Sequence, residues 1–529
     1  MTYAWYSPFR VQELPSVGDL ETWVATSSIR LLILIALVPL SLAFGYLLHA
    51  RPRRQRYLPG VPIVGGSDAA SIAQSRIRAL HDSKSMLLEG YRKTNGGPFY
   101  YPSPSPLGDK LMLPVKYLED LKTAPIKEVD FVGVFRDAFE GKYTGFGSRS
   151  PLLPHVVRGP LNKNLWTVME HVQDEVKVAF DEVFPPCTDW TEVDITYCIT
   201  QIIARLSSRL FGGIGLSRNR EWTQAAIDYA HIGFAAAQGL KAYPEWLKPF
   251  AARFLVPAVN QLNSIKQTAE RVIVPILQER AAAATQQAED KDLLCWIAEQ
   301  AKGDEKDPRF LADIILQIGF AALHTSAATP IQLLYDLCAM PEYIGPLHAE
   351  AQASIDHATQ GPGSVRQGLQ NLVKLDSIIK EGQRFNPLLL TTFERLITKD
   401  FPLSDGLVIP KGTAIGVPAH AISQDPALYP EPEKFKGFRF VEDGEGKKEG
   451  ARSVVWTAAN TSALGFGYGR HACPGRFFAA AEIKAIMVYI LLNYDFRFPD
   501  GQKERPANLL AEVQCLPNPA GRVMFKRRG

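Results

Sequence analysis

The chain has 529 residues, of which 46% are hydrophobic and 21% are charged, an ordinary composition for a globular protein with a sizeable core. Its formal net charge of +3 is close to balance, which does not favour a nucleic-acid partner. The six cysteines are widely scattered and none forms a Cys-x-x-Cys pair, which argues against a zinc site or a disulfide framework and fits a reducing compartment.

The first predicted element is the uncharged apolar stretch Leu31–Leu48, which is long enough to cross a bilayer as a helix. Arginines follow it at once, whereas acidic residues dilute the positive charge of the N-terminal flank, so the positive-inside rule places the rest of the chain in the cytosol. We therefore expect an N-terminal tail over 1–28 and a transmembrane anchor over 29–50. A cleaved signal peptide is the competing interpretation, although the apolar run is long for one and starts late. A buried core helix is a further alternative, which the adjacent arginines disfavour.

A basic, Pro/Gly-rich segment over 51–66 follows, and its turn chemistry predicts a stiff hinge between anchor and body. No Gly/Ser linker divides the remainder, so we expect one domain over 67–529. Helical patterns dominate it, near 166–184, 192–210, 257–282, 309–337 and 366–384. Surface loops are expected at 283–291, 302–308, 355–366 and 441–452.

Strand patterns are few. Phe99–Tyr101 and Lys110–Pro114 read as short strands, and the turn residues within Leu403–Val417 suggest hairpins. The predicted fold class is therefore mainly α with small β-sheets, an α+β chain.

The helix predicted over 309–337 contains His324-Thr325-Ser326, with Pro330 downstream. Proline lacks an N–H and crowds the carbonyl four residues back, so we expect this helix to bend or open near Ser326. A threonine beside such a defect is free to turn its hydroxyl into a cleft. The alternative is that Thr325 bonds back to its own helix, the usual fate of a helical threonine.

Two segments nearer the C-terminus carry further signals. Glu381 and Arg384 share one helical face at i and i+3, a pair that is weak evidence by itself. The run from Phe466 to Arg476 places Cys473 between glycines, just ahead of an apolar helical pattern. Backbone N–H groups at the start of that helix can favour a thiolate, and such a thiolate suits axial ligation of heme iron. A buried structural cysteine is the alternative.

The Cys473 segment resembles the heme-binding loop of the cytochrome P450 family, whose pattern is Phe-x-x-Gly-x-x-x-Cys-x-Gly. The resemblance spans essentially the whole chain, with its specific motifs in the last third, and it is closest to fungal membrane-bound members of secondary metabolism. It implies a cytochrome P450 fold preceded by a single N-terminal transmembrane helix. It also implies heme b (iron protoporphyrin IX) as cofactor, with Cys473 as the metal ligand and Phe466, Gly469, His471, Gly475 and Arg395 around the cofactor.

The resemblance assigns further roles. Thr325, with His324, matches the segment that guides protons to dioxygen, and Glu381, Arg384 and Arg439 match a structural triad. Two departures concern the heme propionates. His471 stands where many members have Arg, and the Trp-x-x-x-Arg pattern fails, because Glu170 stands four residues after Trp166; we consider His155 and Arg158 as substitutes.

The implied function is an NADPH- and O2-dependent heme-thiolate monooxygenase that oxidises a hydrophobic small molecule, by resemblance a terpenoid or meroterpenoid. The implied partner is NADPH-cytochrome P450 reductase, because the chain has no nucleotide-binding glycine fingerprint of its own. The implied location is the endoplasmic reticulum membrane, single-pass, facing the cytosol. Candidate reductase-docking charges are Arg470, Arg476 and Lys484, unless they form an ordinary basic surface. Phe320, Ala321 and Leu388–Thr391 are candidate pocket residues.

Two other functions stay open at this point. An isomerase or dehydratase on the same scaffold needs neither O2 nor a reductase, and a non-catalytic heme-binding membrane protein consumes no NADPH.

Overall fold

The computed structural model describes residues 55–282, 291–358, 364–442, 455–461 and 463–529. The expected tail, the membrane anchor and the start of the hinge lie outside these residues, as do most of the loops expected at 283–291 and 441–452. The fold and the site described below belong to one compact unit formed by residues 55–243 and 250–529.

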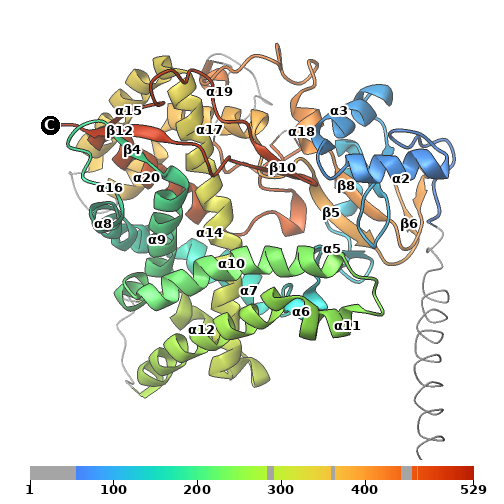
Figure 1. Cartoon of the computed structure of the whole chain (residues 1–529), viewed down its shortest axis with the longest axis horizontal. Coiled ribbons are helices and arrows are strands. Elements are labelled where there is room, and N and C mark those ends of the chain that lie inside the picture. The colour runs from blue at the N-terminus through green and yellow to red at the C-terminus, as the bar shows by residue number, and fades with distance from the viewer. Residues whose placement is uncertain (1–54, 283–290, 359–363, 443–454, 462) are drawn as a thin grey trace, which may run out of the picture. The chain divides into compact units, whose positions relative to one another are not determined.

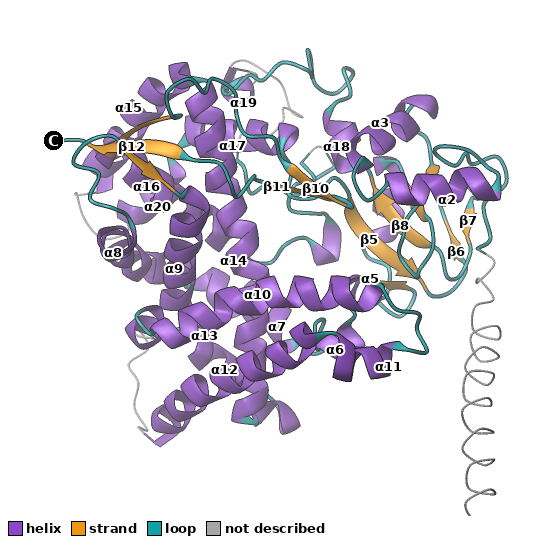
Figure 2. Cartoon of the chain, viewed as in Figure 1, coloured by secondary structure: helices purple, strands orange, loops and turns teal. Residues whose placement is uncertain are grey.

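Helices make up most of this unit, and the strands are short (Figure 2). This confirms the predicted class of a mainly helical chain with small sheets. The helices of eight or more residues are α2 Ala69–Arg78, α3 Ser83–Lys93, α5 Phe131–Ala138, α8 Leu165–Val183, α9 Ile195–Ser217, α10 Arg220–Lys241, α12 Pro257–Ala282, α13 Leu293–Gln300, α14 Pro308–Ala339, α15 Ile344–Ala358, α17 Val373–Phe385 and α20 Arg476–Asn493. Shorter ones include α4 Leu118–Leu121, α6 Gly141–Thr144, α7 Leu152–Val156, α16 Ser364–Gln370, α18 Ala419–Ser423 and α19 Arg439–Glu442.

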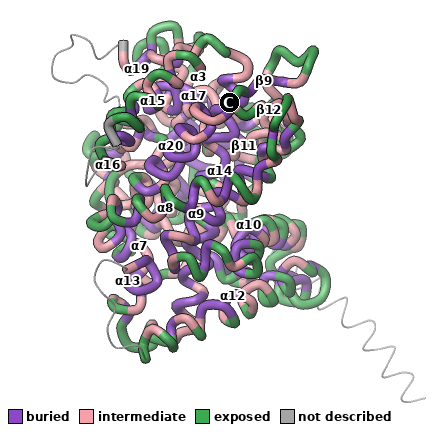
Figure 3. Tube along the Cα trace, turned by 90° about the vertical axis from the view of Figure 1, so that its left-hand side faces the viewer, coloured by how far each residue is buried: buried purple, intermediate pink, exposed green. Residues whose placement is uncertain are grey.

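The long helix α14 runs through the core. Asp307 caps its start by accepting a hydrogen bond from the Arg309 N–H at 2.9 Å, and Pro308 occupies the first helical position, where no N–H is needed. The helix packs against α9, α10, α12, α17 and α20. Most of its residues are buried, as are most of α20 and much of α9 (Figure 3). Among the described residues α14 is the one helix long and apolar enough to span a membrane, but its burial is that of a core helix.

The predicted helix boundaries agree with the structure for 257–282. They differ from it where one predicted helix contains a strand or is divided into two helices. The pattern 257–282 coincides with α12, whereas 192–210 splits into a short strand and then α9. Helix α9 is itself interrupted at Gly212 and Gly213, where Gly213 takes a φ of 72°. The pattern 366–384 is two helices, α16 and α17, instead of one.

The main sheet has the strand order β1-β2-β8-β5-β3 and lies beside α2, α3 and α5 (Figure 1). Its β2–β8 pair is parallel and its other pairs are antiparallel. Of the expected hairpins, the one at Asp405-Gly406 is present as β6–β7, whereas the strand after Pro410-Lys411-Gly412 pairs with β2 and β5 instead of β7. The strands are β1 Phe99–Tyr101, β2 Lys110–Met112, β3 Val129–Asp130, β5 Thr392–Ile397, β6 Phe401–Pro402, β7 Val408–Ile409 and β8 Ala414–Val417 in this region, and β4 Thr191–Val193, β9 Tyr494–Arg497, β10 Leu509–Ala511, β11 Gln514–Leu516 and β12 Val523–Arg527 in the sheets β4-β12-β9 and β10-β11.

The described part of the predicted hinge packs on the main sheet. The Val64 N–H donates to the Tyr100 carbonyl at 3.0 Å, and the Leu58 N–H donates to the Tyr100 hydroxyl at 3.0 Å. Both Leu58 and Val64 are buried. The segment is therefore fixed to β1 from Leu58 onward.

Candidate heme-binding site

Cys473 lies in the loop that enters α20. Its N–H donates to the Phe466 carbonyl at 2.8 Å, which closes the loop on itself. The backbone N–H groups of Gly475 and Arg476 hydrogen-bond to its sulfur at the N-terminus of the helix. The Phe466 ring packs against Trp456 at 5.3 Å, which anchors the start of the loop in the core.

The two glycines of this loop serve different needs. Gly469 has a φ of 69°, and a Cβ there would lie 2.7 Å from the Cβ of Lys122, so a side chain is excluded on two grounds. A Cβ on Gly475 would meet only the Val157 side chain, at 4.0 Å. The space beside Cys473 is therefore open, as a flat ligand requires.

Burial raises the pKa of the Cys473 thiol, and this effect exceeds the lowering by the Gly475 N–H and by the charge and N–H of Arg476. The N–H groups at the helix start therefore favour the thiolate, as the sequence predicts, but burial outweighs them. A bound iron ion would itself deprotonate a coordinating thiol. The loop supplies the hydrogen bonds that a thiolate accepts.

On α14, Ala321 and Thr325 are exposed although the residues before and after them are largely buried. They are four residues apart, so they share one face and border an open space. The Thr325 hydroxyl donates to the Ala321 carbonyl at 2.7 Å, which is the back-bonded alternative. Helix α14 also continues through Pro330 with no non-helical residue, so the expected opening near Ser326 is not found.

His324 faces α10 instead of the open space bordered by Thr325. Its ring centroid lies 4.6 Å from that of His231, which is exposed, and its Nε2 is buried without a hydrogen-bond partner among the described residues. Burial, and then the charge of His231, lower the pKa of His324 to about 4. The imidazole is therefore neutral at neutral pH.

Glu482 connects the two sides of the site and was not predicted from sequence. It is fully buried on α20, and the Ser207 hydroxyl of α9 donates to its Oε1 at 2.8 Å. The Ser326 hydroxyl of α14 interacts with the same carboxyl group, one residue after Thr325. Burial raises the pKa of Glu482 to about 8. The available signal was an acidic residue inside an otherwise apolar helical run.

Glu381, Arg384 and Arg439 form a buried ion-paired cluster. Arg384 Nη2 and Nε donate to the two carboxylate oxygens of Glu381, each at 2.9 Å, and Arg439 Nε donates to the same oxygens at 3.1 and 3.2 Å. The remaining guanidinium N–H groups donate to backbone carbonyls between Ser423 and Lys434. The cluster joins α17 to the loop that precedes the Cys473 segment.

Positive charges converge beside the Cys473 loop. Arg395 is buried on β5 next to a bulge, where Phe393 has a φ of 55°, and its guanidinium lies 4.9 Å from the centre of the Phe131 ring. The same Phe131 ring stacks on His471 at 5.4 Å. Arg158 Nη2 donates to the Arg470 carbonyl at 2.5 Å.

These charges act on His471 together. Burial, followed by the charges of Arg395, Arg158 and Arg470, lowers the pKa of His471 to about 4. The carboxylate of Asp130 opposes this lowering, and that of Glu394 acts on Arg395. Of the two substitutes considered for the missing Trp-x-x-x-Arg arginine, Arg158 joins this group, whereas His155 is exposed and no contact with the group is found for it among the described residues.

Two of the three suggested docking charges are not surface charges. Lys484 is buried and pairs with Asp376 at 2.8 Å, and Arg476 is half-buried and donates to the carbonyls of Thr457 and Cys473. Arg470 is exposed, as expected. The correction for Lys484 arises because this position faces the core once α20 packs against α15 and α16, whereas Arg476 is held by the backbone of its own loop and of Thr457.

Some of the candidate pocket residues are exposed and others are buried. Ala321 and Leu389 are exposed, whereas Phe320, Leu390 and Thr391 are buried. Leu389 therefore remains the accessible apolar side chain of the segment after α17.

The residues present fit a heme. The sulfur of Cys473 receives two N–H groups, a Cβ on Gly475 would meet only the Val157 side chain, and α14 has an exposed face at Ala321 and Thr325. The cationic group around His471 suits two carboxylates such as the heme propionates. The site therefore offers a metal ligand, a flat space and a charged edge.

Comparison with known proteins also indicates a heme-binding protein. Residues 152–523 match the Cytochrome P450 family. The chain is 34% identical over 447 residues to the cytochrome P450 monooxygenase AN1598 of Emericella nidulans, which covers 83% of this chain and 82% of that protein. It is 34% identical to the cytochrome P450 monooxygenase olcJ of Penicillium canescens, over 84% and 83% of the two chains, and 33% identical to an ent-kaurene oxidase of Gibberella intermedia, over 86% and 85%. The chain therefore belongs to the cytochrome P450 family, which binds heme b through a cysteine thiolate, and it is a monooxygenase.

Proposed function

We propose that the substrate of this monooxygenase is a terpenoid or meroterpenoid of fungal secondary metabolism, and that Cys473 is the axial ligand of its heme. Heme bound through a thiolate supplies the activation of dioxygen. The observation that carries the ligand assignment is the Cys473 sulfur, which receives two backbone N–H groups beside the open space at Gly475. Phe466 and Gly469 shape the loop that presents this sulfur.

The opposite side of the site is assigned to Thr325. Its hydroxyl lies on the exposed face of α14, and it needs only to release the Ala321 carbonyl to donate toward a ligand in the open space. Neutral His324, one residue away on the α10 side, has a buried ring nitrogen without a partner among the described residues that is available for a hydrogen bond. The two residues are thereby placed to guide protons.

The charged edge is assigned to the propionates. Arg395 and Arg158 supply fixed charges, and His471 donates a hydrogen bond as a neutral ring. Arg158 then contacts a heme propionate in place of the arginine of the Trp-x-x-x-Arg pattern, which many cytochrome P450 proteins carry. The Glu381–Arg384–Arg439 cluster has a structural role, because it is fully buried and fully hydrogen-bonded away from the open space.

The apolar substrate class is supported by an aromatic cluster on the turn of α14 that precedes Thr325. The Phe320 ring lies 5.2 Å from Phe139 and 5.7 Å from Phe234, with Phe135 at 6.5 Å. Aromatic side chains from α5 and its C-terminal cap, from α10 and from α14 thus meet at Phe320, the residue before Ala321. Similarity to an ent-kaurene oxidase supports a terpenoid.

The proposal also assigns an electron donor and a cellular location to the protein. P450 monooxygenases need a redox partner, and we assign NADPH-cytochrome P450 reductase, with exposed Arg470 at its docking face. The uncharged stretch within 29–50 supports a single-pass anchor in the endoplasmic reticulum membrane, with the catalytic domain over 67–529 facing the cytosol.

Membranes that contain the full chain and its reductase are incubated with ent-kaurene and with representative meroterpenoids, and products are analysed by mass. Added oxygen that requires both NADPH and O2 supports the proposal, whereas turnover without either supports an isomerase or dehydratase. The Cys473→Ala variant is expected to lose the red-shifted carbon monoxide spectrum of a thiolate-ligated heme. Retention of that spectrum refutes the ligand assignment.

A further inference from the structure

Two histidines from different helices meet between α10 and α14. The centres of the His231 ring of α10 and the His324 ring of α14 lie 4.6 Å apart, with 61° between the ring planes. His231 is exposed, whereas His324 is half-buried. An ion from solvent therefore reaches this pair from the His231 side.

The neighbours of His324 decide which of its ring nitrogens is free. The Ile227 carbonyl of α10 is hydrogen-bonded to this ring, and Nε2 has no partner among the described residues. The bond to Ile227 is therefore donated by Nδ1–H, so that Nε2 of the neutral ring carries a lone pair. A histidine that binds a metal is held in the same way, with its other ring nitrogen donating to a carbonyl or carboxylate. Because the pKa of His324 is lowered to about 4 by burial, a proton does not compete for Nε2 at neutral pH.

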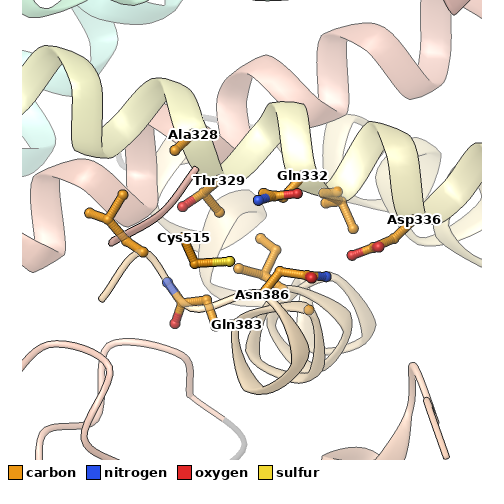
Figure 4. A pocket seen from close by; sticks show the side chains of 11 residues that line it. Ala328, Thr329, Gln332, Asp336, Gln383, Asn386 and Cys515 are labelled. Carbon is orange, nitrogen blue, oxygen red and sulfur yellow. The ribbon is translucent and has the colours of Figure 1, made fainter. Parts of the chain in front are cut away.

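A second buried acceptor on α14 has a different solution. Asp336 Oδ2 also has no partner among the described residues, but Asp336 lines a cavity of about 20 Å³ together with Gln332 and Asn386 (Figure 4). This cavity has room for one water molecule, which is enough to satisfy a carboxylate oxygen. Beside His324 the neighbouring polar group is the His231 ring, from which Nε2 accepts no hydrogen bond.

We propose that His231 and His324 form a binding site for a divalent transition-metal ion such as zinc, which joins α10 to α14. In a tetrahedral site with Zn–N distances of about 2.0–2.1 Å, the centres of two bound imidazole rings lie about 5 Å apart. The observed separation of 4.6 Å differs from this value by about half an ångström, which a small rotation of the exposed His231 side chain supplies. The inference does not depend on the proposed substrate or on the role of Thr325.

The donor set selects the class of ion. Imidazole nitrogens suit zinc, copper and nickel, whereas magnesium and calcium prefer oxygen ligands. Within the described part of the chain no group of three or more His, Cys, Asp or Glu side chains is placed to hold a metal ion. Solvent water therefore completes the shell of the ion on the His231 side, and binding is reversible.

The test measures zinc binding by the untagged, heme-loaded full chain in detergent, in which the Cys473 sulfur is already occupied. His231→Asn is expected to weaken zinc binding at least about tenfold, because loss of an outer-shell partner alone costs about that much in metal affinity. His324→Asn is expected to have the same effect. The control is His81→Asn, which removes another exposed histidine and is expected to bind zinc as tightly as the parent.

The structure of the site is tested by X-ray absorption at the zinc edge. Two imidazole rings are expected around the ion in the parent and fewer than two in His231→Asn. Zinc is also expected to raise the urea midpoint of the parent more than that of His231→Asn, because it binds the folded pair of helices. None of these measurements needs turnover, so they remain informative if the proposed substrate class is wrong. Equal zinc affinity of the parent and His231→Asn overturns the proposal, as does a parent spectrum without two imidazole rings.

Discussion

Replacement of Glu482 by glutamine tests the electrostatic account of the site most directly. Glu482 is wholly buried between α9, α14 and α20, and its carboxyl group interacts with the hydroxyls of Ser207 and Ser326. Because burial raises its pKa to about 8, the group is a neutral acid at pH 7. Glutamine keeps the shape and can accept the Ser207 hydrogen bond through its amide oxygen, but it cannot ionise.

The expected magnitude follows from proton linkage. The unfolded chain loses this proton near its ordinary value of 4.5, whereas the folded chain keeps it up to about pH 8. Between these values the folded state binds more protons, so the free energy of unfolding falls as pH rises, by up to about 1.4 kcal/mol per pH unit. The full window corresponds to about 5 kcal/mol as an upper bound. Glu482→Gln is expected to remove this dependence and to be more stable than the parent at alkaline pH.

The assay is the urea midpoint of the heme-loaded protein across the range from about pH 5 to about pH 9. The control is Glu504→Gln, which changes an exposed carboxylate. The urea midpoint of this variant is expected to change with pH by the same slope as the midpoint of the parent. Equal slopes for Glu482→Gln and the parent refute the reasoning, since they mean that Glu482 ionises alike in the folded and unfolded chains.

Three further variants test the remaining assignments. Arg158→Gln is expected to transfer heme to apomyoglobin about tenfold faster, because one charge-assisted hydrogen bond is lost; an unchanged rate means that no propionate lies there. Thr325→Val is expected to lower product per NADPH about tenfold while peroxide rises, and unchanged coupling contradicts its proton role. Arg439→Ala removes one of the two guanidinium partners of buried Glu381 and takes the same donor from the carbonyls of Pro430 and Glu431, so it is expected to cost about 3–5 kcal/mol in urea unfolding. Lys436→Ala, which removes an exposed ion pair, is the matched control and is expected to cost less than about 1 kcal/mol; equal losses refute the structural role.

Local motifs were predictable because their residues act within one segment. The Cys473 loop needs only its own glycines and the start of the next helix, and the pair Glu381–Arg384 needs only one helical turn. Both lie where the sequence predicts them.

Long-range pairings were not predictable in the same way. Lys484 reads as a surface cation in sequence, yet packing of α20 against its neighbours buries it against Asp376, 108 positions earlier. The Asp336–Arg505 pair joins segments that are even more remote, 169 positions apart. The approach of Arg158 to Arg470 depends on a turn of π-helix at 157–161, which no periodicity indicates.

The hydrogen bond between Trp456 and Gln383 has a consequence for how the protein opens. Trp456 Nε1 donates to Gln383 Oε1 at 2.8 Å, and the same Trp456 ring packs on Phe466 at the start of the Cys473 loop. Gln383 lies on α17 between Glu381 and Arg384, so the loop is tied directly to the buried ion-paired cluster. Fluctuations that expose the loop amides must therefore break contacts of α17 as well, which makes the two segments a single cooperative unit in hydrogen exchange.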